Sequence, residues 1–209
     1  MNLIIFGATG MVGKQLVQQA LFNKHQVKAF GRNVYTTDYL QSENLKLVQG
    51  ALFDEGEVYH AIAGCDAVIS AIGGSADGTD KTRTLGMKNI IKQMQKAGVN
   101  RIIAIGGLGV LNADENSLLL DKDAYPPAFK AVGMEHKKAF DMLHESGLNW
   151  TFVCAPNISN EGPTGQYITN ADYPPEPNKY RINAGDLAMF MLNELNKNDY
   201  IKHRVGISN

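Results

Sequence analysis

The sequence has little cysteine and no long hydrophobic run, and both absences limit what the protein can be. Its two cysteines, Cys65 and Cys154, lie within apolar stretches, and we interpret them as reduced core thiols rather than a disulfide. No apolar run reaches the roughly 18 residues needed to cross a bilayer. The first residues lack the basic and apolar regions of a signal peptide. We therefore expect a cytoplasmic protein that does not bind a membrane.

The sequence also has no large excess of positive over negative side chains, or of negative over positive. Twenty Lys and Arg residues balance 21 Asp and Glu residues, which gives a formal net charge of −1. This balance argues against a basic surface spread over the protein and against nucleic acid as its partner. The histidines and cysteines show no metal-ligand spacing, so we expect no metal site. With 209 residues, 44% of them hydrophobic, the chain is expected to fold as one domain.

Short apolar runs alternate with helical patterns along the chain. The pattern predicts strands at residues 3–6, 27–30, 45–48, 67–72, 101–105 and 150–154, with an edge strand at 204–207. It predicts helices at residues 11–22, 55–63, 82–97, 128–146 and 185–195, the third and fourth ended by Gly98 and Gly147. This alternation is typical of a parallel sheet covered on both faces. We predict an α/β fold, a Rossmann-type doubly wound parallel sheet, for residues 1–209.

Residues 157–181 differ in character from the rest of the chain. They are rich in Pro, Gly, Asn and Tyr, with the run Tyr-Pro-Pro-Glu-Pro at 173–177. Loops this long inside a compact domain are usually functional. We interpret the segment as a small substrate-side loop region, acting as a lid or subdomain. The alternative is a surface excursion without a role.

Glycine is the residue type in excess, at 21 of 209. Gly7, Gly10 and Gly13 form a G-x-x-G-x-x-G motif between the first strand and the first helix, a variant of the dinucleotide fingerprint. Gly7 permits the tight turn, Gly10 lets the backbone approach a pyrophosphate, and Gly13 lets helix and strand pack. Free N–H groups at the helix start favour the diphosphate. We expect Thr9, Met11 and Val12 to contact the bound cofactor too. The alternative is a tight turn with no ligand.

Further glycines follow two central strands of the predicted sheet. They are Gly73 and Gly74 after the fourth strand, and Gly106, Gly107 and Gly109 after the fifth. Ligands of open α/β sheets bind at the carboxyl ends of the strands. Small residues there indicate that backbone lies close to an extended ligand.

The second strand ends in a cation instead of an acidic residue. Sites that prefer NAD usually carry Asp or Glu here, to bind the ribose 2′-hydroxyl. Arg32 occupies the position in this sequence, and its guanidinium can bind a 2′-phosphate and stack on adenine. We therefore predict NADP as the cofactor, with NADPH preferred over NADH. The alternative is a solvated loop arginine.

Several motifs together resemble one enzyme group. They are the glycine motif with Arg32, Gly-Cys-Asp-Ala-Val-Ile-Ser-Ala-Ile-Gly at 64–73, His-Lys-Lys at 136–138, Glu-Ser-Gly-Leu-Asn-Trp-Thr at 145–151, Ala-Pro-Asn-Ile at 155–158 and Pro-Thr-Gly at 163–165. The chain resembles an atypical short-chain dehydrogenase/reductase of the NADPH-dependent flavin reductase/biliverdin-IXβ reductase group, with its NmrA-like relatives. The resemblance implies a seven-stranded Rossmann domain that binds NADPH across the strand ends. It also implies hydride transfer to a flavin or tetrapyrrole, with His136 near the cofactor. We expect the cofactor also to contact Leu52, Ile72, Pro156, Asn157 and Ile158.

The sequence departs from the wider family at the expected proton donors. Ordinary short-chain dehydrogenases place Tyr and Lys four residues apart on one helix face. Here Tyr125 is followed by two prolines, and Lys130 is one position out of step. The Ser that this group carries after the fifth strand is also absent, since residues 105–108 read Ile-Gly-Gly-Leu. Ala51 stands where the family often has an Asp beside the adenine.

These departures favour hydride transfer between planar rings, because the cofactor carries that chemistry and the protein supplies orientation. We therefore predict an NAD(P)H-dependent reductase of a flavin, quinone or tetrapyrrole-like acceptor, acting as a monomer or small homo-oligomer. His136 is its candidate catalytic residue, although a lone helix histidine is more often a surface residue. Lys137 and Lys138 could contact the ribose or be a solvated helix face. Two alternatives are an NmrA-like regulatory protein that senses NADP without turnover, and an atypical nucleotide-sugar epimerase or dehydratase.

Overall fold

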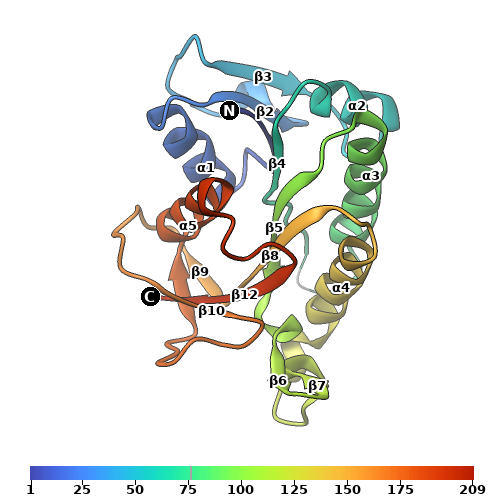
Figure 1. Cartoon of the computed structure of the whole chain (residues 1–209), viewed down its shortest axis with the longest axis vertical. Helices are drawn as coiled ribbons and strands as arrows, with labels where there is room; N and C mark the ends of the chain where they lie inside the picture. Colours follow the sequence, from blue (N-terminus) through green and yellow to red (C-terminus); the bar gives the residue numbers. More distant parts are fainter. Residues whose placement is uncertain (76) are drawn as a thin grey trace.

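The computed structural model describes residues 1–75 and 77–209. Within them, a central sheet of eight strands has the order β3-β2-β1-β4-β5-β8-β12-β10 (Figure 1). The strands pair in parallel except for β10, which pairs with β12 antiparallel. The predicted doubly wound parallel sheet is therefore confirmed. The strands are β1 (Asn2–Phe6), β2 (Gln26–Gly31), β3 (Leu45–Gln49), β4 (Ala67–Ser70), β5 (Arg101–Gly107), β8 (Asn149–Ala155), β10 (Ile168–Ala171) and β12 (His203–Ser208).

Helices cover both faces of the sheet, as Figure 1 shows. On one face lie α1 (Met11–Phe22) and α5 (Ala184–Lys197), and on the other α2 (Glu55–Ile62), α3 (Thr82–Ala97) and α4 (Pro127–His144). Alternate residues of β1 enter the two cores: Leu3 and Ile5 pack under α1 and α5, and Ile4 and Phe6 under the other three. This follows from the two-residue period of a strand.

The helix ends follow their local sequence. Gly98 adopts φ +71° after α3, the left-handed conformation predicted for a C-terminal cap. Asp54 caps α2 by accepting a hydrogen bond from the Glu57 N–H, and Asn183 caps α5 by accepting one from the Asp186 N–H. Each cap satisfies a backbone N–H group that the first turn of the helix leaves without a partner.

The strand predicted at residues 204–207 is present as β12, but its predicted position at the edge of the sheet was wrong. β12 is flanked by β8 and β10, so the sheet has one strand more than the seven that the resemblance implied. The extra strand β10 falls within residues 157–181, as does β9 (Asn157–Ser159), which pairs in parallel with β11 (Arg181–Asn183). Part of this segment is therefore regular structure. The four residues of β10 are too few to show periodicity, and pairing with β12 gives them their structure.

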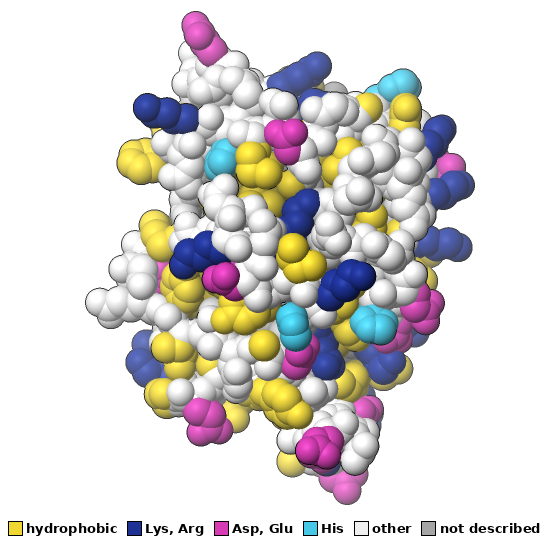
Figure 2. Space-filling view, viewed as in Figure 1, with side chains coloured by type: hydrophobic (Ala, Val, Ile, Leu, Met, Phe, Trp, Pro, Cys, Tyr) yellow, Lys and Arg dark blue, Asp and Glu magenta, His cyan; other side chains and the backbone are white. Residues whose placement is uncertain are grey.

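A short hairpin of β6 (Asn112–Asp114) and β7 (Ser117–Leu118) follows β5 and was not predicted. Figure 2 shows acidic side chains at this protruding hairpin, while over the rest of that face basic and acidic side chains are interspersed. Among the described residues, no helix is long and apolar enough to cross a membrane. Cys65 and Cys154 are buried free thiols, and burial raises the pKa of both. The interpretation of two core thiols is confirmed.

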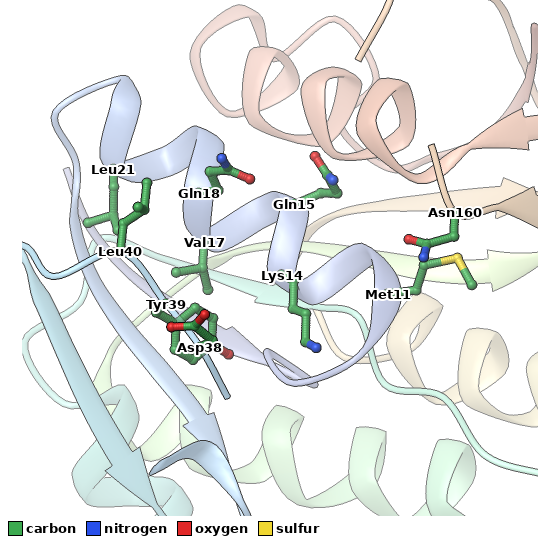
Figure 3. Close-up of a pocket in the computed structure, with 10 residues that line it drawn as sticks. All are labelled: Met11, Lys14, Gln15, Val17, Gln18, Leu21, Asp38, Tyr39, Leu40 and Asn160. Atoms are coloured by element: carbon green, nitrogen blue, oxygen red, sulfur yellow. The ribbon is translucent and has the colours of Figure 1, made fainter. Parts of the chain in front are cut away.

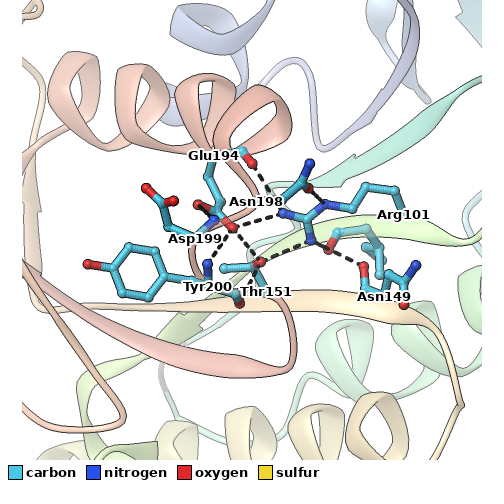
Figure 4. Close-up of polar contacts among 8 residues, drawn as sticks. Arg101, Asn149, Thr151, Glu194, Asn198, Asp199 and Tyr200 are labelled. Atoms are coloured by element: carbon cyan, nitrogen blue, oxygen red, sulfur yellow. Dashed lines mark hydrogen bonds and ion pairs between the residues drawn. The ribbon is translucent and has the colours of Figure 1, made fainter.

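A buried ion pair secures the end of the sheet where β5 and β8 begin. Arg101 Nη2 lies 3.0 Å from Glu194 Oε1, and their side chains are 11% and 1% exposed (Figure 4). The Glu194 carboxylate also accepts hydrogen bonds from the Tyr200 N–H and the Thr151 hydroxyl. This network joins the last turn of α5 to the start of the strands. It lies opposite the carboxyl ends, so we assign it a structural role.

Candidate functional site

The turn between β1 and α1 requires glycine at two of its three glycine positions. Gly7 has φ +76°, and a Cβ there would lie 2.3 Å from the carbonyl oxygen of Ala71, just after β4. A Cβ at Gly13 would lie 2.1 Å from the Gly7 carbonyl oxygen. Both contacts are with backbone, which cannot rotate away. The turn therefore brings the start of α1 directly over the ends of β1 and β4.

Gly10 is different, because the fold alone does not require it to be glycine. It precedes α1 with φ −76°, and a Cβ there would meet, among the described atoms, the Gly7 carbonyl oxygen at 3.3 Å. No side chain caps the helix at Gly10, and the first turn holds no acidic residue. The first N–H groups of α1 thus have no side-chain cap and no acidic residue in that turn, and they and the helix dipole favour an anion there. This cradle fits a diphosphate.

The end of β2 lies beside the same turn. A Cβ at Gly31 would come within 3.3 Å of Thr9 Cγ2, so the backbone of β2 passes close to the glycine motif. Arg32 follows and is exposed, with its carbonyl oxygen accepting a hydrogen bond from Gln49 Nε2 at 2.9 Å. The guanidinium is held by no ion pair in the part of the chain that the structure describes. It is therefore available to an anion bound near the turn.

Two residues predicted to contact the cofactor, Leu52 and Ile72, meet on α3. A Cβ at Gly86 of α3 would come within 2.4 Å of Leu52 Cδ2 and 3.4 Å of Ile72 Cδ1. The backbone N–H of Ala51 donates a hydrogen bond of 2.6 Å to Glu57 Oε2. The carboxylate that the family often places at residue 51 is thus supplied nearby by α2. Sequence reasoning missed Glu57, because nothing in its spacing ties it to residue 51.

Two aromatic rings fill the space beside the glycines that end β5. A Cβ at Gly106 would lie 2.0 Å from Phe152 Cε1, and one at Gly107 would lie 2.7 Å from His136 Cδ2. A serine at either position would have to displace a ring. In this chain the imidazole of His136 occupies the space that a serine side chain at residue 107 would need.

His136 is half-buried and neutral. Burial, followed by the positive charge of Arg83, lowers the pKa of His136 to about 3, with Glu135 acting in the opposite direction. Around neutral pH the imidazole therefore carries one N–H donor and one acceptor nitrogen. It lies on α4 against the end of β5, and is not the surface residue that the alternative described.

Glu135 is a buried residue of the site that sequence reasoning missed. Its carboxylate accepts hydrogen bonds from Thr84 Oγ1 at 2.6 Å, Lys81 Nζ at 3.1 Å and Lys138 Nζ at 3.2 Å. Burial by itself raises the pKa of Glu135, and these donors outweigh it so that the pKa is lowered. The network fixes α4 against α3. Lys138 is thus paired within the protein, as is Lys137, which contacts Asp141 at 2.7 Å.

Pro156, Asn157 and Ile158 follow the carboxyl end of β8. Asn157 begins β9 with an exposed side chain, and Ile158 packs against the core under α5. The nearby turn at residues 163–165 is held by the buried Asp186, which accepts hydrogen bonds from the Thr164 and Gly165 N–H groups at 2.8 and 2.7 Å. Sequence reasoning missed Asp186 because the contact crosses more than twenty residues.

A groove of about 610 Å³ runs along α1 (Figure 3). Met11, a predicted cofactor contact, and Asn160 border it near the start of the helix, and Lys14 and Asp38 add opposite charges to its walls. The groove adjoins the glycine turn from the outer side of the helix. The other predicted site residues, all of them within the described part of the chain, do not line this groove.

The profile of a family described as NAD(P)H-binding matches residues 7–198 of the chain. The chain belongs to this NAD(P)H-binding family. The matched range contains the glycine turn, Arg32 and the strand ends. The narrower resemblance to the flavin reductase/biliverdin-IXβ reductase group stays a prediction.

One relative matches this chain over nearly its whole length, and two others are longer proteins that match over part of theirs. YwnB of Bacillus subtilis is 24% identical, and the match covers 99% of this chain and 98% of YwnB. A chloroplast protein of Arabidopsis thaliana is 26% identical over 80% of this chain. A second Arabidopsis protein, provisionally named pinoresinol-lariciresinol reductase 3, is 28% identical over 73% of this chain. The chain spans 62% and 46% of the length of these two plant proteins.

Three solved structures are similar over nearly the whole chain, each with a TM-score of 0.86. One, provisionally named an exported protein, is from Burkholderia pseudomallei, is 29% identical and covers 100% of both chains. Another, provisionally named an NADH-flavin reductase, is from Streptococcus pneumoniae, is 28% identical and covers 100% of this chain and 99% of its own. The third, provisionally named an epimerase, is from Bacteroides thetaiotaomicron, is 26% identical and covers 99% and 96%.

Proposed function

We propose that this protein is an oxidoreductase that transfers hydride from NADPH to a flavin or a related planar acceptor. The observation that carries the proposal is the end of β5. There Gly107 packs against the neutral imidazole of His136. The Tyr–Lys pair of ketone reductases is not formed, because Tyr125 lies outside α4, which begins at Pro127. A strand end lined by the uncharged rings of Phe152 and His136 suits two stacked rings.

The residues of the chain would bind and orient both partners. The N–H groups at the start of α1 would hold the diphosphate, and Leu52 and Ile72 would offer an apolar surface near the adenosine end. When bound, the dinucleotide supplies a hydride from its reduced nicotinamide ring. The Phe152 and His136 rings, which pack on Gly106 and Gly107, would flank that ring at the end of β5 and help to fix its distance from an acceptor stacked above.

The preference for NADPH over NADH rests on Arg32. It follows Gly31, where a Cβ would lie 3.3 Å from Thr9 Cγ2, and its guanidinium forms no ion pair among the described residues. A guanidinium binds a phosphate through two parallel hydrogen bonds. The 2′-phosphate of NADPH is the group that this position would recognise.

Oxidation of NADPH, followed by absorbance in separate reactions with FMN, FAD and menadione, tests the proposal. We expect turnover with at least one of them, and turnover supported by NADH at a lower kcat/KM. A protein that binds NADPH and oxidises it with none of the three would contradict the proposed reductase. That result would favour the NADP-sensing alternative.

The epimerase alternative has the relative from Bacteroides thetaiotaomicron in its favour. Epimerases regenerate their bound cofactor, so they do not consume NADPH in the steady state. Net oxidation of NADPH in proportion to acceptor reduced therefore separates the two activities in the same assay.

A further inference from the structure

Tyr125 places its hydroxyl in a slot that two glycines leave open. A Cβ at Gly109 would come within 2.6 Å of Tyr125 Oη, and one at Gly133 within 3.2 Å. Gly109 belongs to the short 3-10 helix η2 (Leu108–Val110), directly after β5, and Gly133 belongs to α4. The hydroxyl therefore lies between the end of β5 and the helix that carries His136.

The slot puts Tyr125 beside His136. Gly109 is two residues beyond Gly107, against which the imidazole packs, and Gly133 is about one helical turn before His136. The two side chains thus line the same stretch of backbone at the carboxyl end of β5, where ligands of such sheets bind. Burial shifts the pKa of both groups, and the positive charge of Arg83 adds to the shift of His136.

Both groups are uncharged near neutral pH. Burial raises the pKa of Tyr125, so the phenol keeps its proton, and burial lowers the pKa of His136 to about 3. The neighbouring ammonium groups of Lys81 and Lys138 lie 3.1 and 3.2 Å from the Glu135 carboxylate. Two neutral hydrogen-bond donors therefore face the end of β5.

We propose that Tyr125 and His136 form one acceptor-binding pair, which holds the carbonyl or imide edge of a neutral planar ring. This inference rests on the proposed function and narrows its acceptor class. A ring edge that bears a carboxylate is disfavoured, because two neutral donors cannot balance a charge withdrawn from water, and the nearby Arg83 guanidinium already donates to the Gly74 and Ser75 carbonyl oxygens at 2.9 Å. An isoalloxazine or a quinone presents a suitable neutral edge.

The pair binds the acceptor and is unchanged by turnover. In each cycle the acceptor gains two electrons and one proton as hydride from reduced nicotinamide, and takes a second proton from solvent. Oxidised nicotinamide and reduced acceptor are the products. Tyr125 and His136 keep the acceptor ring in a fixed position relative to the nicotinamide during the transfer.

The test is the affinity for FMN, measured by quenching of its fluorescence in the presence of saturating NADP⁺. One neutral hydrogen bond changes affinity by a factor of about 2 to 12. We expect Tyr125→Phe to raise the Kd of FMN by that factor and to leave the Kd of NADP⁺ unchanged. Tyr59→Phe is the matched control, because Tyr59 lies on α2 beneath Lys96, and it should change neither constant.

Gly133→Ala provides a second variant that keeps the phenol. Its methyl group would crowd Tyr125 Oη at 3.2 Å, so it should also raise the Kd of FMN. In the Tyr125→Phe background the same methyl group meets no hydroxyl and should have no further effect. Urea unfolding of each variant verifies that it is folded.

Three results would overturn the pair. One is an unchanged Kd of FMN in Tyr125→Phe while the wild type binds FMN. Another is a rise in the Kd of FMN on Gly133→Ala that is equal in the wild-type and Tyr125→Phe backgrounds, which would mean that the methyl group acts on the helix and not on the hydroxyl. The third is a wild type that binds NADP⁺ but neither binds nor reduces FMN or menadione. That outcome overturns the proposed function together with the pair. Failure of the pair alone would instead leave the wild type able to bind or reduce FMN or menadione.

Discussion

The imidazole of His136 occupies the space that a side chain on Gly107 would need, since a Cβ there would lie 2.7 Å from His136 Cδ2. The strand-end glycine and the helix histidine are therefore one structural unit. Any larger residue at 107 requires the imidazole to move.

Replacing His136 should separate ring stacking from acid catalysis. If the protein only orients two rings, His136→Ala will lower kcat for FMN reduction by less than the roughly 10²-fold typical of a lost general acid. His60→Ala, at an exposed position of α2, is the control. A larger loss, with the Kd of NADP⁺ unchanged, would identify His136 as the proton donor. Stopped-flow measurement of flavin reduction gives the rate for each variant, and a separate titration gives the Kd of NADP⁺.

Stability in acid should depend on the same residue. The pKa of His136 is about 3 in the folded protein and roughly 6.5 for an unperturbed histidine. Between those values the unfolded chain binds a proton that the folded protein does not, so the free energy of unfolding falls as the pH is lowered. Urea unfolding at pH 7 and pH 4.5 should show a smaller loss in His136→Ala than in the wild type. Equal losses would contradict the assigned pKa.

Gly10→Ala should impair the cofactor site without disturbing the fold. In the structure a methyl group at residue 10 meets the Gly7 carbonyl oxygen at 3.3 Å, but it would project into the space expected for the diphosphate. We expect calorimetry to show NADPH binding weakened at least tenfold, about 1.4 kcal/mol, with an unchanged urea midpoint. Gly162→Ala, where a Cβ meets nothing within 4 Å, is the control. Unchanged affinity for NADPH would exclude the turn from the site.

Arg32→Ala should remove most of the preference for NADPH. A charge-assisted hydrogen bond contributes roughly 1.5–3 kcal/mol, so NADPH should bind about 10 to 150 times more tightly than NADH in the wild type, and more so at low salt. The variant should weaken NADPH with little change for NADH. Lys46→Ala, at an exposed position of β3, controls for loss of one positive charge. Equal binding of the two cofactors to the wild type would refute the role of Arg32.

Glu194→Ala should destabilise the protein while sparing cofactor binding. It leaves the Arg101 guanidinium buried without its partner, and breaking a buried pair this way costs about 3–5 kcal/mol. The pair lies at the amino ends of the strands, so the Kd of NADPH should not change. Glu55→Ala breaks the exposed pair with Lys92 and should have a much smaller effect on urea unfolding. Similar losses in both variants would contradict the structural role of Glu194.

The sequence by itself determined the parts of the fold that local patterns encode. Val, Ile and Leu in the strands, helical spacing in α1 and α3, and the cap at Gly98 each depend on residues a few positions apart. The glycine motif belongs to this class, because the turn at Gly7 and the approach of Gly13 to it lie within seven residues. The sequence missed β10, because four residues carry too little pattern and a partner strand provides their structure.

Tertiary structure alone decided how the site is assembled. The contact of His136 with Gly107, the position of the Tyr125 hydroxyl between Gly109 and Gly133, and the carboxylate of Glu57 beside Ala51 join residues from different elements. Such contacts leave no periodicity or spacing in the sequence. The neutrality of His136 follows from them as well, since its pKa is set by burial and by charges on α3 and α4 that only folding brings to the imidazole.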